Sequence, residues 1–452
     1  MHIEQHGGQI LERLRTIQQL RSCEDSPFSQ ERRARIGDIE LGYVNWGIPV
    51  SARNYKQHLA QREELTLETE QMIDSSGFIR GYHYPNSYDL FSRKAQDAHV
   101  QYGITLGESL LRRRNWKHIA FLDVGSNSSW STIAEEISAG LRKKGYIIDS
   151  TRMYGLACYN AFASIVDRSR KENPEFHGQP GLTMSIESLS GQQVDPNDHR
   201  VWWTFGNGAA GLAWIPHLEI EHICGKTIVE PDTKGAMTIP LTFKSAPLED
   251  RIPPPSGYIY AEGTDPGEQT RFYATKYGVF FDMHEAPNGK INIDSGLSFV
   301  AFGRGMPPLM REVEKIYEEE YASEYGPLAD TRLMHQPSYP IIYAQEKELI
   351  RLALTQDYEL TKKEAYAYLH LDTQQERQQY LADHAITNFV EPKLPWSLKE
   401  ARVNNISGGA ALVDATIKAQ NGLLPFNQSI ECDVYGIGIT KGVHMIKIRK
   451  AA

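Results

Sequence analysis

Cysteine is scarce in this chain, and long apolar runs are absent. The 452 residues include four cysteines, Cys23, Cys158, Cys224 and Cys432, whose spacing forms neither a Cys-x-x-Cys pair nor a zinc-binding pattern. We therefore expect no metal site, and reduced thiols in a cytoplasmic protein. No run approaches the roughly 20 apolar residues of a membrane-spanning helix, and the first residues lack the basic and apolar regions of a signal peptide.

Basic residues do not outnumber acidic ones. The chain has 48 Lys and Arg against 57 Asp and Glu, a formal net charge of −9, and the two signs are interspersed. This pattern indicates neither a nucleic-acid surface nor a basic membrane patch. The composition, 40% hydrophobic and 23% charged, is that of a globular protein large enough for two cores or for one core built from two similar halves.

Strand-like and helical patterns alternate along most of the chain, which indicates an α/β layered architecture. We expect an N-terminal extension over residues 1–35, and the similar order within 36–220 and 221–452 indicates an internal repeat. The polar stretch 343–395 predicts an inserted helical hairpin. The other expected helices cover residues 54–74, 89–114, 131–144 and 306–317, and the expected strands cover residues 36–44, 117–125, 146–149, 181–188, 200–205, 431–440 and 443–448.

Cys158 follows a strand-like run and opens a helical pattern. Ala161, Phe162, Ile165 and Val166 recur after it at helical spacing, which puts Cys158 in the first turn of a buried helix. The helix dipole and the unpaired backbone N–H groups there favour the thiolate, which is the nucleophilic form. A structural, unreactive cysteine is the competing interpretation.

His335 and Asn405 each lie between a strand-like run and a helical one, as Cys158 does. In α/β folds, loops at strand ends carry the chemistry. A cysteine, a histidine and an asparagine suit acyl transfer through a thioester, because the thiol accepts the acyl group while the other two donate hydrogen bonds to a carbonyl oxygen that gains negative charge. Taken singly, His335 would be a structural histidine and Asn405 a helix cap.

Glycine is concentrated in residues 206–211, after the expected strand at 200–205. A loop of this kind could cradle phosphate, but it lacks the lysine and hydroxyl residue of a P-loop and the order of a dinucleotide-binding fingerprint. We interpret it as a tight turn with close backbone packing.

Five short segments carry motifs that occur together in one known family. They are Leu-Ala-Cys-Tyr-Asn-Ala-Phe at 156–162, Phe-Gly-Asn-Gly-Ala at 205–209, His-Gln-Pro-Ser at 335–338, Asn-Ile-Ser-Gly-Gly at 405–409 and Gly-Ile-Gly-Ile-Thr at 436–440. In this order they resemble the thiolase superfamily, and within it the β-ketoacyl-acyl-carrier-protein synthase III group. The resemblance implies a five-layered αβαβα fold with two pseudo-repeated halves, and a homodimer.

The resemblance also implies a role for each residue. Cys158 would be the acylated nucleophile, and His335 and Asn405 would bind the carbonyl of the extender thioester and stabilise the carbanion left by decarboxylation. The backbone N–H groups of Cys158 and Gly438 would form the oxyanion hole. The substrates would be acyl thioesters of coenzyme A or acyl-carrier protein, with no bound cofactor. We also assign substrate binding to Arg80, in a turn-rich loop at 74–82, and to Phe205, Gly206 and Gly208.

The chain departs from the family pattern at four places, one of which is Pro337-Ser338, where the family has alanine and asparagine after the histidine. The family's coenzyme A-binding loop corresponds to residues 71–78, which lack its tryptophan and arginine, so a donor on acyl-carrier protein is favoured. The gap from His335 to Asn405 is about twice the family's usual length, and the run 215–300 is also long. These departures favour a specialised relative in polyketide or other secondary metabolism.

Three functions remain open. The first is decarboxylative Claisen condensation with a malonyl-type thioester, which Asn405 favours because its amide donates a hydrogen bond and is not a base. The second is a non-decarboxylating acyltransferase that forms an ester or amide. The third is a non-catalytic partner subunit that binds acyl chains, although such a subunit has no chemical need for all three polar residues.

Overall fold

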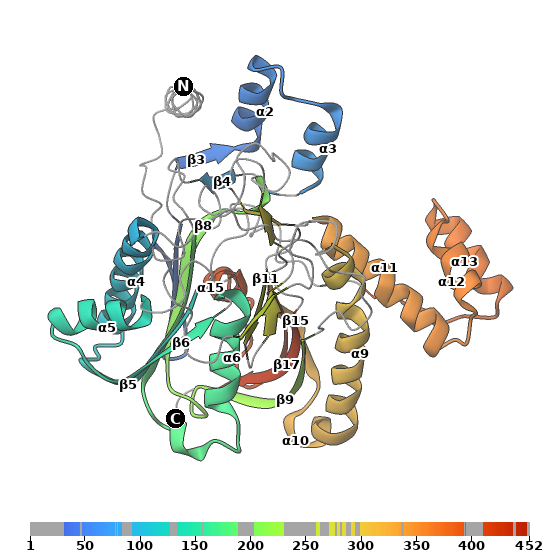
Figure 1. Cartoon of the computed structure of the whole chain (residues 1–452). Helices are drawn as coiled ribbons and strands as arrows, with labels where there is room; N and C mark the ends of the chain where they lie inside the picture. The colour runs from blue at the N-terminus through green and yellow to red at the C-terminus, as the bar shows by residue number, and fades with distance from the viewer. Residues whose placement is uncertain are drawn as a thin grey trace.

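Two larger sheets enclose a pair of central helices in this computed structural model (Figure 1). The structure describes residues 31–45, 48–76, 78, 80–83, 93–126, 133–155, 157–188, 203–229, 259–262, 271–275, 278–280, 283–285, 291–293, 299–335, 339–392, 394, 410–436 and 440–449.

The first sheet has six strands in the spatial order β1-β2-β8-β7-β5-β6. Their bounds are Arg32–Ile36 (β1), Ile39–Asn45 (β2), His118–Ser126 (β5), Ile147–Gly155 (β6), Gly181–Ser188 (β7) and Asn207–Trp214 (β8). Strand β5 lies between β6 and β7 and is parallel to both, whereas β8 runs antiparallel to both β7 and β2.

The second sheet has four strands in the order β15-β16-β17-β9. Their bounds are Leu328–Met334 (β15), Ser429–Gly436 (β16), Thr440–Ile448 (β17) and Ile220–Val229 (β9). Strand β15 is parallel to β16, and β17 is antiparallel to both β16 and β9. The same sequence of directions runs through β5, β7, β8 and β2 of the first sheet, so the predicted internal repeat is confirmed in the topology.

Helices complete a five-layered arrangement. Helices α6 (Ala157–Ser169) and α15 (Ala410–Gln420) each contact strands of both sheets and form the central layer (Figure 1). Helices α4 (Arg93–Arg113) and α5 (Ile133–Lys143) cover the outer face of the first sheet. Helix α9 (Met306–Ile316) covers the second sheet and packs against α11 (Tyr339–Gln356). The layers follow the predicted αβαβα order.

Apolar spacing explains the outer helices. The side chains of Ile133, Ile137 and Leu141 recur one turn apart in α5, and all are fully buried. In α9 the stripe predicted from Met306, Leu309, Met310 and Val313 is buried as well. Each helix therefore has one apolar face that packs on a sheet.

The glycine-rich run is a central strand and not a turn, which corrects the prediction for residues 206–211. Every residue of β8 is buried, because α4 lies on one face of the sheet and α15 on the other. A Cβ on Gly211 would lie 2.9 Å from the carbonyl oxygen of Thr183, so small residues serve close packing here. The expected strand at 200–205 is also wrong where described, since Trp203 and Thr204 lie in a helical turn.

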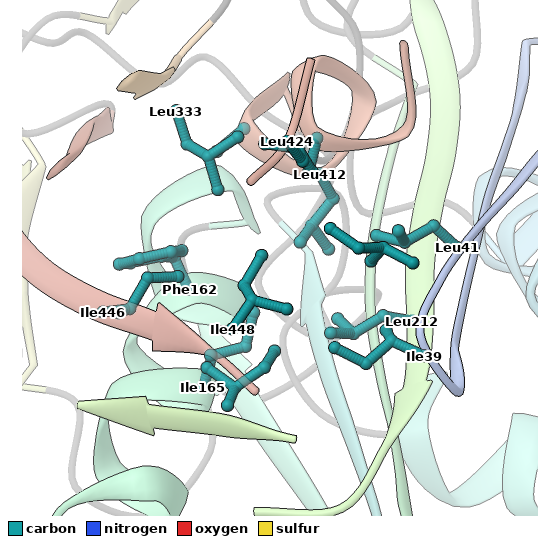
Figure 2. Close-up of a pocket in the computed structure, with 14 residues that line it drawn as sticks. Ile39, Leu41, Phe162, Ile165, Leu212, Leu333, Leu412, Leu424, Ile446 and Ile448 are labelled. Carbon is teal, nitrogen blue, oxygen red and sulfur yellow. The ribbon is translucent and has the colours of Figure 1, made fainter. Parts of the chain in front are cut away.

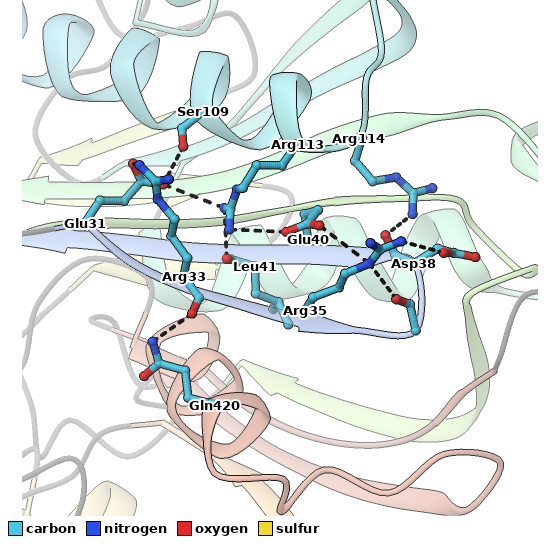
Figure 3. Close-up of polar contacts among 11 residues, drawn as sticks. Glu31, Arg33, Arg35, Asp38, Glu40, Leu41, Ser109, Arg113, Arg114 and Gln420 are labelled. Carbon is cyan, nitrogen blue, oxygen red and sulfur yellow. Dashed lines mark hydrogen bonds and ion pairs between the residues drawn. The ribbon is translucent and has the colours of Figure 1, made fainter.

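The predicted first strand, 36–44, is a hairpin of β1 and β2. Its tight turn uses Gly37, with a φ of +60°. Because β1 begins at Arg32, residues 32–35 belong to the sheet and not to an extension. Arg113 of α4 donates to the Leu41 carbonyl at 3.0 Å and pairs with Glu40 at 3.2 Å (Figure 3). The hairpin is thereby fixed to α4.

Two other predictions are corrected. The single helix expected at 54–74 is two helices, α2 (Ala52–Gln61) and α3 (Leu67–Ser75). Arg80 lies not in a loop but in β4 (Arg80–His83), which pairs with β3 (Ile48–Ser51).

The inserted segment contains more than a hairpin. After α11 it forms α12 (Lys362–Leu369) and α13 (Gln374–Asp383), which project from the body (Figure 1). Further short elements are η1 (Pro174–Phe176), β10 (Ile259–Glu262), β11 (Arg271–Thr275), β12 (Gly278–Phe280), β13 (Met283–Glu285), β14 (Ile291–Ile293), η3 (Phe299–Arg304), η4 (Tyr317–Tyr321) and α10 (Ala322–Tyr325). Within the described residues, none of the helices has the length and apolar character needed to cross a bilayer.

Candidate active site

Cys158 is the second residue of α6. Strand β6 ends at Gly155 and the helix begins at Ala157, so the backbone of Cys158 lies in the first turn, as predicted. The N–H groups of a first turn have no partner within the helix. The site therefore offers backbone donors and the positive end of a helix dipole.

A buried charge pair fixes α6 to the first sheet. Arg168 of α6 donates to both carboxylate oxygens of Asp123 on β5, at 2.8 and 2.9 Å. Ser164 donates to the same carboxylate at 2.5 Å. The Arg168 guanidinium also lies over the ring of Phe121, 4.1 Å from its centroid. These contacts determine where the helix that carries Cys158 sits.

His335 is buried at the carboxyl end of β15, where the sequence placed it. Its backbone N–H donates to the carbonyl oxygen of Asp433 on β16 at 2.8 Å. Because β15 and β16 are parallel, their carboxyl ends share one edge of the sheet. Strand β16 ends at this edge with Gly436, and Gly438 lies outside the described residues.

Helix α15 is attached to the end of β15. The carboxylate of Asp414 accepts a hydrogen bond from the Met334 N–H at 2.9 Å and pairs with Lys418 at 2.9 Å. Lys418 in turn donates to the Arg332 carbonyl. Asn405 precedes α15 by a few residues and lies outside the described residues.

Helix α6, strand β15 and helix α15 line one apolar cavity. It has a volume of about 30 Å³. Phe162, Leu333 and Leu412 all line it (Figure 2). Phe162 lies one turn after Cys158, Leu333 two residues before His335, and Leu412 seven residues after Asn405. Three stretches distant in sequence thus converge.

Sequence reasoning missed a cluster of charged side chains beside His335. Arg332 pairs with Glu431 of β16 and with Glu314 of α9, each at 2.6 Å. Burial raises the pKa of Asp433 to about 6, although Arg332 opposes the shift. Burial also raises the pKa of Glu431 well above its ordinary value. The sequence signal for this cluster was a pair of acidic residues, Glu431 and Asp433, two positions apart in the otherwise mainly apolar strand 429–436.

A pair of histidines, which sequence reasoning also missed, lies near Phe162. The ring of His444 on β17 is centred 6.0 Å from that of Phe162. Its Nδ1 lies 3.2 Å from Nε2 of His222, and its Nε2 lies 3.1 Å from the Thr227 hydroxyl. Burial lowers the pKa of His222 to about 3 and that of His444 well below its ordinary value. Both imidazoles are therefore neutral at pH 7.

The four residues assigned to substrate binding do not line the cavity. Gly208 pairs with Asn45 on one side and with Glu187 on the other. Strand β8 therefore begins at the edge where the parallel strands β5, β6 and β7 end, and Phe205 and Gly206 directly precede it. Arg80 lies in the β3–β4 ribbon. Only Phe205, Gly206 and Gly208 are thereby placed at the sheet edge from which the link to α6 leaves.

Metal binding has no support in the part of the chain that the structure describes. There, no group of three or more His, Cys, Asp or Glu side chains could hold a metal ion. Two of the cysteines, Cys224 and Cys432, are free and buried, and burial raises the pKa of Cys224 to about 12. A thiol with so high a pKa is not a nucleophile at neutral pH.

Known structures resemble this chain, although no protein-family model and no curated protein sequence matches it. One similar structure is 3-oxoacyl-(acyl carrier protein) synthase III from Pseudomonas aeruginosa PAO1. The match covers 93% of this chain and 99% of that one, with 11% identity and a TM-score of 0.53. The chain also matches a type III pentaketide synthase from Neurospora crassa over 92% of its own length and all of that protein, with 11% identity and a TM-score of 0.52. The match to 1,3,6,8-tetrahydroxynaphthalene synthase from Streptomyces coelicolor A3(2), a type III polyketide synthase, covers 94% and 99%, with 9% identity and a TM-score of 0.51. At such identities the likeness shows the fold.

Proposed function

We propose that this chain, which has the thiolase-like fold of condensing enzymes, is an acyltransferase that carries an acyl group on Cys158 and extends it by decarboxylative condensation. The observation that supports this function is that α6, β15 and α15 line one cavity. These are the described elements nearest in sequence to Cys158, His335 and Asn405. A fold shared with 3-oxoacyl-(acyl carrier protein) synthase III and with type III polyketide synthases adds weight.

In the first half-reaction the Cys158 thiolate attacks the carbonyl carbon of an acyl thioester. The oxygen gains negative charge, which the N–H groups of Cys158 and Gly438 stabilise. The bond to the donor sulfur then breaks, and the donor thiol leaves with a proton. The position of Cys158 in the first turn of α6 supports this step, because its N–H has no acceptor within the helix.

In the second half-reaction a malonyl-type thioester loses carbon dioxide. The electron pair of the broken bond moves toward the thioester carbonyl, whose oxygen accepts hydrogen bonds from His335 and Asn405. The resulting carbanion attacks the acyl carbon on Cys158, and a β-ketoacyl thioester leaves as the Cys158 thiolate is restored. Burial of His335 supports this role, since a hydrogen bond to a developing charge is stronger away from water.

The donor in this proposal is carried by an acyl-carrier protein, and the enzyme acts as a homodimer. Residues 71–75 belong to α3, and Ser75 stands where the family has the arginine that binds coenzyme A. The exposed Ser75 hydroxyl donates to the Met72 carbonyl at 3.2 Å, so this end of the helix offers a serine and no cation at that position. We expect acyl-carrier protein to be the better donor.

Intact-protein mass spectrometry tests the function. The wild type and Cys158→Ser are incubated with a panel of acyl thioesters, each on coenzyme A and on acyl-carrier protein. The expected result is an added acyl mass on the wild type only. His335→Ala should still be acylated but should release no carbon dioxide from a malonyl thioester, because His335 acts in the second half-reaction.

Two further reactions separate the open functions. A β-keto product after addition of malonyl thioester supports condensation, whereas an ester or amide formed on added alcohol or amine, without loss of carbon dioxide, supports plain transfer. A wild type that no donor labels would contradict the acyl-enzyme mechanism and favour a non-catalytic subunit.

A further inference from the structure

Phe162 lines the apolar cavity and lies one helical turn after Cys158. Residues four apart lie on one face of a helix, one turn from each other. Long side chains on a helix lean toward its N-terminus, which is the direction of the turn that holds Cys158. The ring is buried and forms part of the cavity wall (Figure 2).

The cavity beyond Phe162 suits hydrocarbon and little else. Its lining is entirely apolar, with Ile39 and Leu212 from the first sheet and Ile446 and Ile448 from the second. Its volume of about 30 Å³ is large enough for a water molecule, but a water there would find no polar partner. An apolar group entering it would displace no bound water.

Phe162 also lies near His444, with ring centres 6.0 Å apart. His444 is itself fixed by hydrogen bonds to His222 and Thr227. One neighbour of the phenyl ring is therefore held in place by the second sheet.

We propose that the cavity is the far end of the acyl pocket and that Phe162 sets the length of acyl chain that Cys158 can carry. This inference rests on the proposed function. Short acyl chains fit on the near side of the ring, and longer ones require the space that the ring occupies. Removal of the ring would join the two spaces and add on the order of 100 Å³.

Alkyl methanethiosulfonates test the inference without requiring any catalysis. The Cys158 thiolate attacks the sulfenyl sulfur, a mixed disulfide forms, and methanesulfinate leaves with the bonding electron pair, while the thiol proton passes to solvent. The rate constants for the methyl and hexyl reagents are measured by intact mass on the full chain. Cys158→Ser gives the background from the other cysteines.

In the wild type we expect the hexyl reagent to modify Cys158 at least about tenfold more slowly than the methyl reagent. In Phe162→Ala the hexyl-to-methyl rate ratio should rise at least about tenfold, since each buried methylene is worth about a fourfold gain. Ile165→Ala is the matched control, because Ile165 lines the same cavity one turn farther from Cys158. It enlarges the cavity but leaves the ring, so its ratio should stay near that of the wild type.

An unchanged ratio in folded Phe162→Ala, or an equal rise in Ile165→Ala, would overturn the inference. Should Phe162→Ala fail to fold, Phe162→Leu should give a smaller rise in the same direction. The acyl-enzyme assay with donors of increasing chain length then separates the two proposals. Failure of every donor to label the wild type contradicts the proposed function, while the alkyl rate ratio still decides whether Phe162 limits the pocket.

Discussion

Arg168 and Asp123 hold the helix of Cys158 against the first sheet, and both side chains are buried. Arg168→Met would leave the Asp123 carboxylate without its cation in the core. We expect the free energy of unfolding to fall by about 3–5 kcal/mol, the usual cost of breaking a buried ion pair by removing one partner. Urea unfolding followed by circular dichroism measures the loss.

A double variant provides the control for this prediction. Asp123→Leu with Arg168→Met removes both charges, so most of the lost stability should return. A loss below about 1 kcal/mol in the single variant would mean that Asp123 finds another partner or water, and that the pair does not anchor α6.

Single residues were predictable where the signal was local. Cys158 and His335 were located correctly relative to their helix and strand, because each lies between a strand-like run and a helical pattern. The Asp123–Arg168 pair could not be predicted, since its members are 45 residues apart and only the packing of α6 on β5 makes them neighbours. Asn405 and Gly438, outside the described residues, remain predictions.

At the scale of elements, β9 and β17 share a pair of buried imidazoles. His222 and His444 have lowered pKa values in the folded chain, whereas an unfolded histidine titrates near 6.5. The stability that this difference provides is present above about pH 6.5 and is lost as the pH falls, because the unfolded state then binds protons that the folded state does not. Between pH 7.5 and pH 5, each histidine should lower the free energy of unfolding by about 2 kcal/mol.

His444→Gln should therefore weaken the pH dependence of unfolding. The measurement is the free energy of unfolding in urea at pH 7.5 and at pH 5, and the drop should be about 2 kcal/mol smaller in the variant than in the wild type. Thr227→Val is the matched control, because it removes the hydroxyl beside His444 but no titrating group. It should lower stability at both pH values and keep the wild-type drop. Equal drops in all three proteins would contradict the prediction.

Elements were predictable wherever their periodicity was simple. Helices α4, α5 and α9 fall close to their expected bounds. Strand β8 was misread because a strand buried on both faces shows no alternation, and its glycines resemble a turn. The β1–β2 hairpin was read as one strand because the tight turn at Gly37 is only two residues long.

At the scale of the whole molecule, the two halves attach their central helices in the same way. Helix α6 contacts β5 through Ser164 and Arg168, and α15 contacts β15 through Asp414 and Lys418. In each helix the two polar residues are four positions apart. They contact corresponding strands of the two sheets, since β5 lies next to β7 as β15 lies next to β16. The repeat therefore extends from topology to the contacts that position the candidate active site.

The unit formed by α12 and α13 lies outside this repeat. Its apolar cluster includes Tyr368 and Ala365 and joins α11 through Ile350 and Leu354, separately from the cluster between the sheets. Helix α13 buries none of its residues. Few buried apolar contacts predict a low free energy of local opening, so we expect this unit to open independently of the sheets.

Native-state hydrogen exchange followed by mass spectrometry checks this expectation. The backbone amides of α12 and α13 should exchange at least about a hundredfold faster than those of β16 and β17, because local opening there breaks no sheet contact. Tyr368→Ala removes a ring packed against Tyr380 and Phe389, and it should accelerate exchange in α12 and α13 while β16 and β17 keep their rates. Faster exchange in both sets would mean that the unit unfolds together with the sheets. The helical unit would then be an integral part of the two-sheet fold rather than an addition to it.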